Sequence, residues 1–173
     1  MTATSPKVEL RLVERPPSHG ELYEQYSAYV ASLGYRLLGR DGDVDDLVQD
    51  VFLAAVEGLS SLREAGAVKG WLATLTVRLA GRKLRRRRIA SFFGFDGTED
   101  DIAAPGATPE ERALLGQVYE ALDAVAVDAR LAWVLRHVEG EPLDSVAKLC
   151  GCSLATAKRR ISAAQEDIER RLA

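Results

Sequence analysis

The sequence predicts an all-α protein made of two small helical domains joined by a flexible linker. Apolar residues at helical spacing recur through both halves of the 173-residue chain. Apolar residues make up 47% of the chain but aromatic residues only 6%, so the cores must consist mainly of Leu, Val and Ala, a composition that favours helices. A segment rich in Gly, Pro and acidic residues separates the two halves.

The first domain is predicted over residues 21–89, after a poorly structured lead-in at residues 1–20. Three apolar patterns step by three and four residues and predict three helices. Their inward residues are Tyr23, Tyr26, Val30, Leu33 and Leu37; Val44, Leu47, Val48, Val51 and Ala55; and Val68, Trp71, Leu72, Leu75 and Leu79. The third helix is also apolar or small on its opposite side, from Ala73 to Leu84, so we expect neighbours on both sides. Asp43 is expected to cap the second helix, and Gly58 to end it.

The predicted linker covers residues 90–107, and the second domain covers residues 108–173. Thr108, Pro109 and Glu111 have the pattern of a helix cap, a first-turn proline and a capping-box acid. Four helical patterns follow. Their inward residues are Leu114, Leu115, Val118, Leu122 and Val125; Leu131, Val134, Leu135 and Val138; Leu143, Val146 and Ala147; and Ala157, Ile161, Ala164, Ile168 and Leu172.

Charge is distributed very unevenly, although the net charge is only −3. Residues 41–57 contain six acidic residues and no basic one, whereas residues 69–88 contain eight basic residues and no acidic one. Binding to a polyanion depends on the local field rather than on total charge. The basic segment therefore predicts contact with phosphate, and the acidic segment predicts either a basic protein partner or a solvated face.

The last two predicted helices, separated by "CGCS" with Gly151 at the reversal, have the spacing of a helix-turn-helix. If the inward residues of the final helix face a core, its outward face carries Ala155, Arg159, Ser162, Ala163 and Glu166. Ser153 is expected to cap this helix. An αα-hairpin with a solvated basic face fits the same spacing, so spacing alone leaves both interpretations open.

Three segments resemble the bacterial sigma factors. "GDVDDLVQDVFLAAV" is similar to the region-two signature, "KGWLATLTVRLAGRKLRRRR" to the promoter-melting segment that follows it, and "HVEGEPLDSVAKLCGCSLATAKRRISAAQEDIERRL" to region four. A short acidic linker in place of a long region three is typical of the extracytoplasmic-function subgroup. The resemblance covers about residues 21–89 and 108–173.

The resemblance implies a factor that joins core RNA polymerase and directs it to promoters. Polymerase would be bound by Asp46, Gln49, Asp50 and Phe52. The −10 element would be met by a loop near residues 59–69 and by Lys69, Arg78, Lys83, Arg85, Arg86, Arg87 and Arg88. The −35 element would be read by Ser153, Ala155, Thr156, Lys158, Arg159, Arg160 and Ser162. The family also implies an anti-sigma factor as a partner.

The chain departs from the family pattern at several positions. The family often has Arg-Asn at Val77-Arg78, Asp at Arg82, and Pro-Pro at Ala126-Val127. Because of the first two departures, the base contacts that the family makes with the −10 element are not assigned to residues of this chain. Cys150 and Cys152 replace common aliphatic residues, and we expect them to act as small apolar residues rather than as metal or redox groups.

Other classes of function remain as alternatives. A stand-alone helix-turn-helix regulator would dimerise through its first domain, and an adaptor in a signalling complex would not bind DNA. No nucleotide loop, Ser/His/Asp set or paired carboxylates in an apolar setting indicate an enzyme, and no cofactor or metal is expected. No run of about 18 apolar residues indicates a membrane span, and the N-terminus lacks the apolar segment of a signal peptide. We therefore expect a cytoplasmic protein that is monomeric when free.

Overall fold

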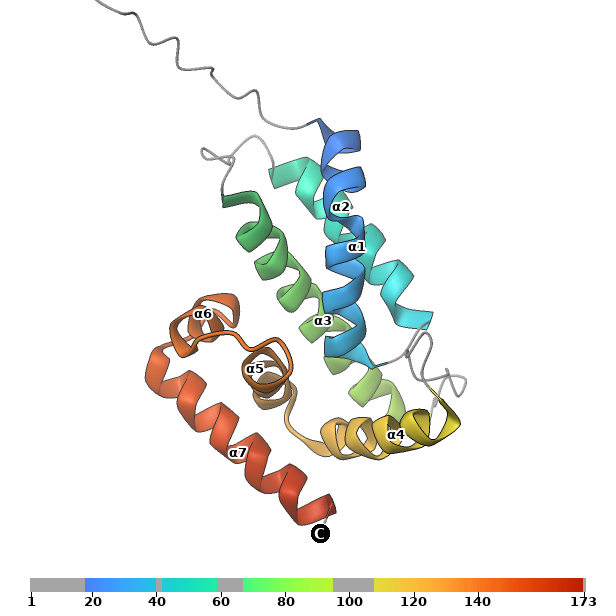
Figure 1. Cartoon of the computed structure of the whole chain (residues 1–173), viewed down its shortest axis with the longest axis vertical. Coiled ribbons are helices and arrows are strands. Elements are labelled where there is room, and N and C mark those ends of the chain that lie inside the picture. The colour runs from blue at the N-terminus through green and yellow to red at the C-terminus, as the bar shows by residue number, and fades with distance from the viewer. Residues whose placement is uncertain (1–17, 40–41, 59–66, 95–107, 173) are drawn as a thin grey trace, which may run out of the picture.

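The structure is a computed structural model that describes residues 18–39, 42–58, 67–94 and 108–172. Seven α-helices and no β-strand occur in these ranges, so the all-α prediction is confirmed (Figure 1). Most of the predicted lead-in, most of the linker and the loop at residues 59–66 lie outside the described residues.

The first lobe consists of α1 (His19–Leu38), α2 (Gly42–Gly58) and α3 (Val68–Phe92). Helix α1 begins with a capping box between Ser18 and Glu21, and it ends at Gly39, whose φ of 76° is a left-handed conformation that favours glycine. Helix α2 ends at Gly58, as predicted, but it begins at Gly42. Asp43 therefore lies inside the first turn rather than at the cap, and its carboxylate forms an ion pair with Arg87 of α3.

The core of the first lobe is the one that the helical spacing predicts, with one shift of register. Val30, Leu37, Leu47 and Leu72 are fully buried. At the start of α1, however, Leu22 is buried and Tyr23 is 51% exposed. The inward stripe reaches Leu22 because positions 22, 26 and 30 lie one above another at 100° per residue.

The second lobe consists of α4 (Pro109–Ala124), α5 (Val127–His137), α6 (Leu143–Leu149) and α7 (Leu154–Leu172). The predicted capping box is present: the Thr108 hydroxyl accepts a hydrogen bond from the Glu111 N–H, and the Glu111 carboxylate accepts one from the Thr108 N–H. The inward residues predicted for α7 from Ala157 to Ile168 are buried. Leu114 of α4, predicted to face inward, is instead 63% exposed, because the second lobe packs on the later turns of α4.

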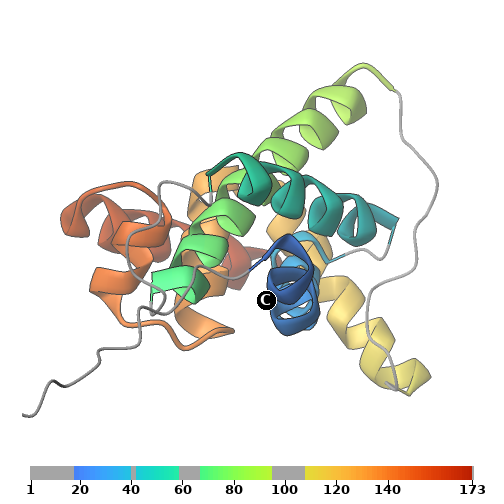
Figure 2. The same ribbon diagram turned by 90° about the horizontal axis from the view of Figure 1, so that it is seen from above.

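Helix α3 lies at the centre of the molecule and contacts both lobes. One of its faces packs on α1 and α2, and the other packs on α5 and α6 (Figures 1 and 2). The burial of both faces confirms the prediction from its two apolar sides. As a result, the buried core continues from the first lobe into the second.

Candidate functional site

Helix α2 presents the acidic residues that the sequence singled out. Asp46, Gln49 and Asp50 are all exposed, and their spacing places them on one side of the helix. The Lys83 ammonium of α3 lies 3.7 Å from a carboxylate oxygen of Asp46 and 3.7 Å from one of Asp50. The Lys83 side chain is only 12% exposed, so the first lobe already holds one cation against this acidic face.

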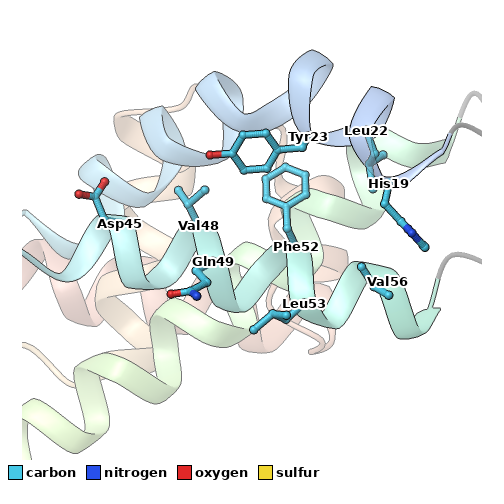
Figure 3. Close-up of a pocket in the computed structure, with 9 residues that line it drawn as sticks. All are labelled: His19, Leu22, Tyr23, Asp45, Val48, Gln49, Phe52, Leu53 and Val56. Carbon is cyan, nitrogen blue, oxygen red and sulfur yellow. The ribbon is translucent and has the colours of Figure 1, made fainter.

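An apolar groove runs along α1 and α2, and Gln49 lies in its lining (Figure 3). Its volume is about 480 Å³. Phe52 forms part of the wall, because its ring is largely buried and packs edge-on against Tyr23 with centroids 4.9 Å apart. Leu53 is 60% exposed. The lining consists of His19, Leu22, Tyr23, Asp45, Val48, Gln49, Phe52, Leu53 and Val56.

Most of this groove is not predicted by the sequence pattern. The resemblance implies a role for Gln49 and Phe52, but Leu53 and Val56 were not predicted to take part, and Tyr23 was predicted only as an inward residue. The sequence did contain an indication of the groove, because Leu53 and Val56 are apolar residues outside the inward stripe of an amphipathic helix. Such positions are normally polar when they face only solvent.

The basic segment of α3 is divided between exposed cations and cations that already have partners in the chain. Arg78 and Arg86 are exposed. Lys69 lies over the ring of Tyr29, 4.7 Å from its centroid. The remaining predicted cations are paired: Lys83 with Asp46 and Asp50, Arg85 with Asp128 at 2.7 Å, Arg87 with Asp43, and Arg88 with the Val125 carbonyl at 3.3 Å.

Trp71 belongs to the core of the first lobe. It packs over the end of α2, where a Cβ added to Gly58 would lie 2.7 Å from the indole ring. The helical spacing also placed Trp71 among the inward residues of α3.

Helices α6 and α7 are joined by a short turn in which Gly151 adopts a φ of 60°. The Ser153 hydroxyl accepts a hydrogen bond from the Thr156 N–H at 3.2 Å, so Ser153 caps α7 as predicted. The predicted outward face is exposed along its whole length: Ala155, Arg159, Ser162, Ala163 and Glu166, with Lys158 beside it. Arg160 turns away from this face and binds Asp128 of α5 at 2.8 Å.

Three groups with shifted pKa values lie between the lobes or in the α6–α7 turn. Arg130 is 2% exposed, and burial lowers its pKa against the opposing effect of Asp123. The hydrogen bond to Glu139 raises the pKa of Arg36. Burial raises the pKa of the Cys150 thiol to about 11. In the ranges that the structure describes, no group of three or more His, Cys, Asp or Glu side chains could hold a metal ion, and no helix is long and apolar enough to cross a membrane.

Comparison with known proteins agrees with this arrangement. Residues 22–89 match the family described as sigma-70 region 2, which covers the first lobe. The chain is 29% identical over 161 residues to the ECF RNA polymerase sigma factor SigE of Mycolicibacterium smegmatis, covering 91% of this chain but only 62% of that protein. It is 28% identical over 162 residues to the ECF RNA polymerase sigma-E factor of Escherichia coli, covering 87% of this chain and 84% of that protein.

Two solved structures share the fold at 22% sequence identity. One is the sigma factor RpoE of Bartonella quintana in complex with the anti-sigma factor NepR, with a TM-score of 0.64 over 87% of this chain and 93% of that chain. The other is CnrH in complex with the cytosolic domain of CnrY, with a TM-score of 0.61 over 89% of this chain and 86% of that chain. The first lobe thus matches sigma-70 region 2, and the chain is similar to ECF-type sigma factors across both lobes.

Proposed function

We propose that this chain binds core RNA polymerase and directs it to specific promoters. The observation that carries the proposal is the face of α2, where the exposed Asp46 and Asp50 lie on the same side of the helix as Gln49, which lines an apolar groove. A face of this kind suits a partner helix that combines apolar residues with basic ones, because the groove buries the former and the carboxylates attract the latter. Curated relatives of the chain are named as RNA polymerase sigma factors.

The outward face of α7 would read the −35 element. It presents Lys158 and Arg159 beside the small residues Ala155 and Ser162, all exposed. Cations can contact phosphate and guanine, and small side chains let the helix approach the floor of the major groove. Thr156 and the capping Ser153 lie at the end of the helix that would enter the groove first.

The basic segment of α3 would meet the −10 element. Arg78 and Arg86 are exposed and have the charge that the phosphate backbone requires. The other predicted cations would add to this track once their present contacts are exchanged for phosphate. They are Lys69, Lys83, Arg85, Arg87 and Arg88. Two DNA elements on separate lobes bind weakly one at a time, so polymerase would be needed to fix their separation.

One solved neighbour is the sigma factor RpoE in complex with the anti-sigma factor NepR, and the other is CnrH in complex with the cytosolic domain of CnrY. An anti-sigma factor is therefore proposed as a partner of this chain, and the groove on α1 and α2 is a surface that it could cover. The catalytic step would belong to the polymerase. Since the template of the polymerase is chromosomal DNA, the chain would act in the cytoplasm, without inserting into the membrane. It would be monomeric before it joins polymerase.

Asp50→Arg tests the docking surface. The variant should lose binding to core polymerase by at least about 100-fold, because a cation replaces an acid on the contact face. Its far-ultraviolet circular dichroism should match the native chain, since Asp50 is exposed. Glu120→Arg is the matched control, because it makes the same charge reversal at an exposed position of α4.

Size-exclusion chromatography with core polymerase measures the outcome. Full polymerase binding by the Asp50→Arg chain would show that the docking face is assigned wrongly. A native chain that forms a stable dimer and binds a palindrome without polymerase would instead favour the stand-alone regulator. A chain that binds neither polymerase nor DNA would favour the adaptor.

A further inference from the structure

The groove on α1 and α2 leaves apolar side chains in contact with solvent. Among the residues that line it, Tyr23 is 51% exposed, Leu53 60% and Val56 46%. Asp45 adds an exposed carboxylate to the same lining. The groove thus suits a short stretch of polypeptide that combines apolar side chains with a basic one, because the walls bury the former and the carboxylate attracts the latter.

The chain enters the described fold beside this groove. His19, the first residue of α1, lies in the lining together with Val56 at one end of the groove, and Asp45 lies at the other end (Figure 3). Asp45 and Val56 are 11 positions apart in α2, which corresponds to about 16 Å along a helix. Since six residues of extended chain cover about 20 Å, a stretch of that length upstream of His19 can fold back along the groove and fill it.

Residues 7–13, with the sequence "KVELRLV", have the composition that the groove requires. Val8, Leu10 and Leu12 alternate with charged residues. In an extended backbone, alternate side chains point to opposite sides, so these three apolar side chains would form one face. A segment this short cannot build a core of its own, and it can bury this face only against another apolar surface.

The direction of the segment also matches the charge of the groove. Residues 14–17 connect the segment to α1 and contain two prolines, which disfavour a continuation of the helix there. A chain that reverses direction over these residues would follow the groove from the His19 end towards Asp45. Lys7, the first residue of the segment, would then lie at the end that carries the Asp45 carboxylate, where opposite charges attract.

We propose that residues 7–13 occupy the groove on α1 and α2 of their own chain, with the apolar face of the segment against the groove wall and Lys7 beside Asp45. A tethered segment is present at an effective concentration of about 1 mM, so a weak intrinsic affinity is sufficient. The occupancy itself does not depend on polymerase, but its consequence rests on the proposed function, because polymerase would use the same groove and would have to displace the segment. The apparent affinity for polymerase is then reduced in proportion to the fraction of chains whose groove is free.

Two double variants separate docking of the segment from its mere presence. Leu10→Ser/Leu12→Ser removes two side chains of the apolar face and should free the groove. Glu9→Ser/Arg11→Ser is the matched control, because it makes two changes to serine on the opposite side of the same segment and leaves its net charge unchanged. Neither variant changes a residue of the groove, so the helical circular dichroism of both should match that of the native chain.

Methyl nuclear magnetic resonance on the full chain, without polymerase, detects the segment in the groove. The native chain and the control should show nuclear Overhauser contacts between the methyl groups of Leu53 or Val56 and those of residues 8–12. Leu10→Ser/Leu12→Ser should lose these contacts and shift the Leu53 and Val56 signals. A native chain without the contacts, or unchanged signals in Leu10→Ser/Leu12→Ser, would overturn the proposal. Contacts found only between differently labelled chains in a mixed sample would also overturn it, because a second copy would then supply the segment.

Binding to core polymerase tests the consequence. Leu10→Ser/Leu12→Ser should bind polymerase about threefold more tightly than the native chain, because no docked segment has to be displaced, and the control should bind as the native chain does. Equal affinities of the native chain and Leu10→Ser/Leu12→Ser would overturn the competition between segment and polymerase. Failure of the proposed function gives a different result, since polymerase then binds none of the three chains while the methyl contacts persist.

Discussion

The basic faces of α7 and α3 differ in how the folded chain treats their cations. Within the described part of the chain, no side-chain hydrogen bond or ion pair holds Lys158 or Arg159 of α7, and both are exposed. In α3, by contrast, Lys83, Arg85 and Arg87 all have acidic partners. The proposed DNA-binding face of α7 therefore has cations available to DNA, whereas much of the α3 segment would first have to exchange its partners.

The difference follows from where the two helices lie. Helix α7 lies at the edge of the molecule and turns one face to solvent, while α3 lies between its own lobe and the other (Figure 1). A long cation on a central helix is surrounded by other elements, and burial without a partner is costly. Its acidic neighbours are thus part of the fold, and a basic run in the sequence does not by itself mean an available basic surface.

The largest contrast in stability is expected between Arg130 and Arg159. Arg130→Met should lower the free energy of unfolding by about 3 kcal/mol, because it leaves Asp123 and two carbonyl groups of α1 without this partner. Arg159→Ala should change it by less than about 0.5 kcal/mol, since that side chain is exposed. Urea unfolding followed by circular dichroism measures both values. Equal losses would contradict the distinction between an interlobe arginine and a surface one.

Although Arg159 is expected to contribute little to stability, it should contribute strongly to transcription. Arg159→Ala should reduce initiation at a cognate promoter about tenfold, the effect typical of losing a base or phosphate contact, with polymerase affinity unchanged. Arg170→Ala provides a control on the same helix, because Arg170 is 70% exposed and pairs only locally, with Asp167 at 2.9 Å. Reconstituted transcription measures both variants, and an equal loss in the two would remove the special role of Arg159.

Neighbouring arginines of α3 should differ in the free chain. Arg86→Ala should weaken binding to a DNA duplex about threefold without polymerase, because Arg86 is exposed. Arg85→Ala should change it less, because the Asp128 carboxylate already pairs with this cation. Fluorescence anisotropy at fixed salt compares them. A larger loss for Arg85 would show that its ion pair does not mask it.

A separate effect concerns Cys150, which we treat as an apolar residue of the α6–α7 turn. Its thiol has a pKa of about 11 because burial favours the neutral form. The resulting stability is present below the ordinary thiol pKa of about 9 and is lost as the pH rises towards 11. Between pH 8 and 10.5 the native chain should therefore lose about 1 kcal/mol more than Cys150→Ala. Urea unfolding at the two pH values tests this, and parallel losses would mean that the thiol is not held neutral.

The sequence by itself determined the helices and most of their inward faces. Apolar spacing located the core residues of α2 and α7, and the capping pattern at Thr108 located the start of α4. These features depend on neighbouring residues along one helix, which is why local patterns report them. The same reasoning placed Asp46 and Asp50 on the surface of α2 and Arg159 on the outward face of α7.

Only the tertiary structure decided which charged residues are available to a partner and which are already paired within the chain. Asp128 lies 43 residues from Arg85 and 32 from Arg160, and Lys83 lies more than 30 residues from the acids that it bridges. No periodicity along one helix relates residues so far apart, because their meeting depends on how whole helices pack. The groove between α1 and α2 and the fit of Tyr119 and Leu131 onto two glycines arise in the same way. Local spacing sets the face on which a side chain lies, and the assembly of the helices sets what that face meets.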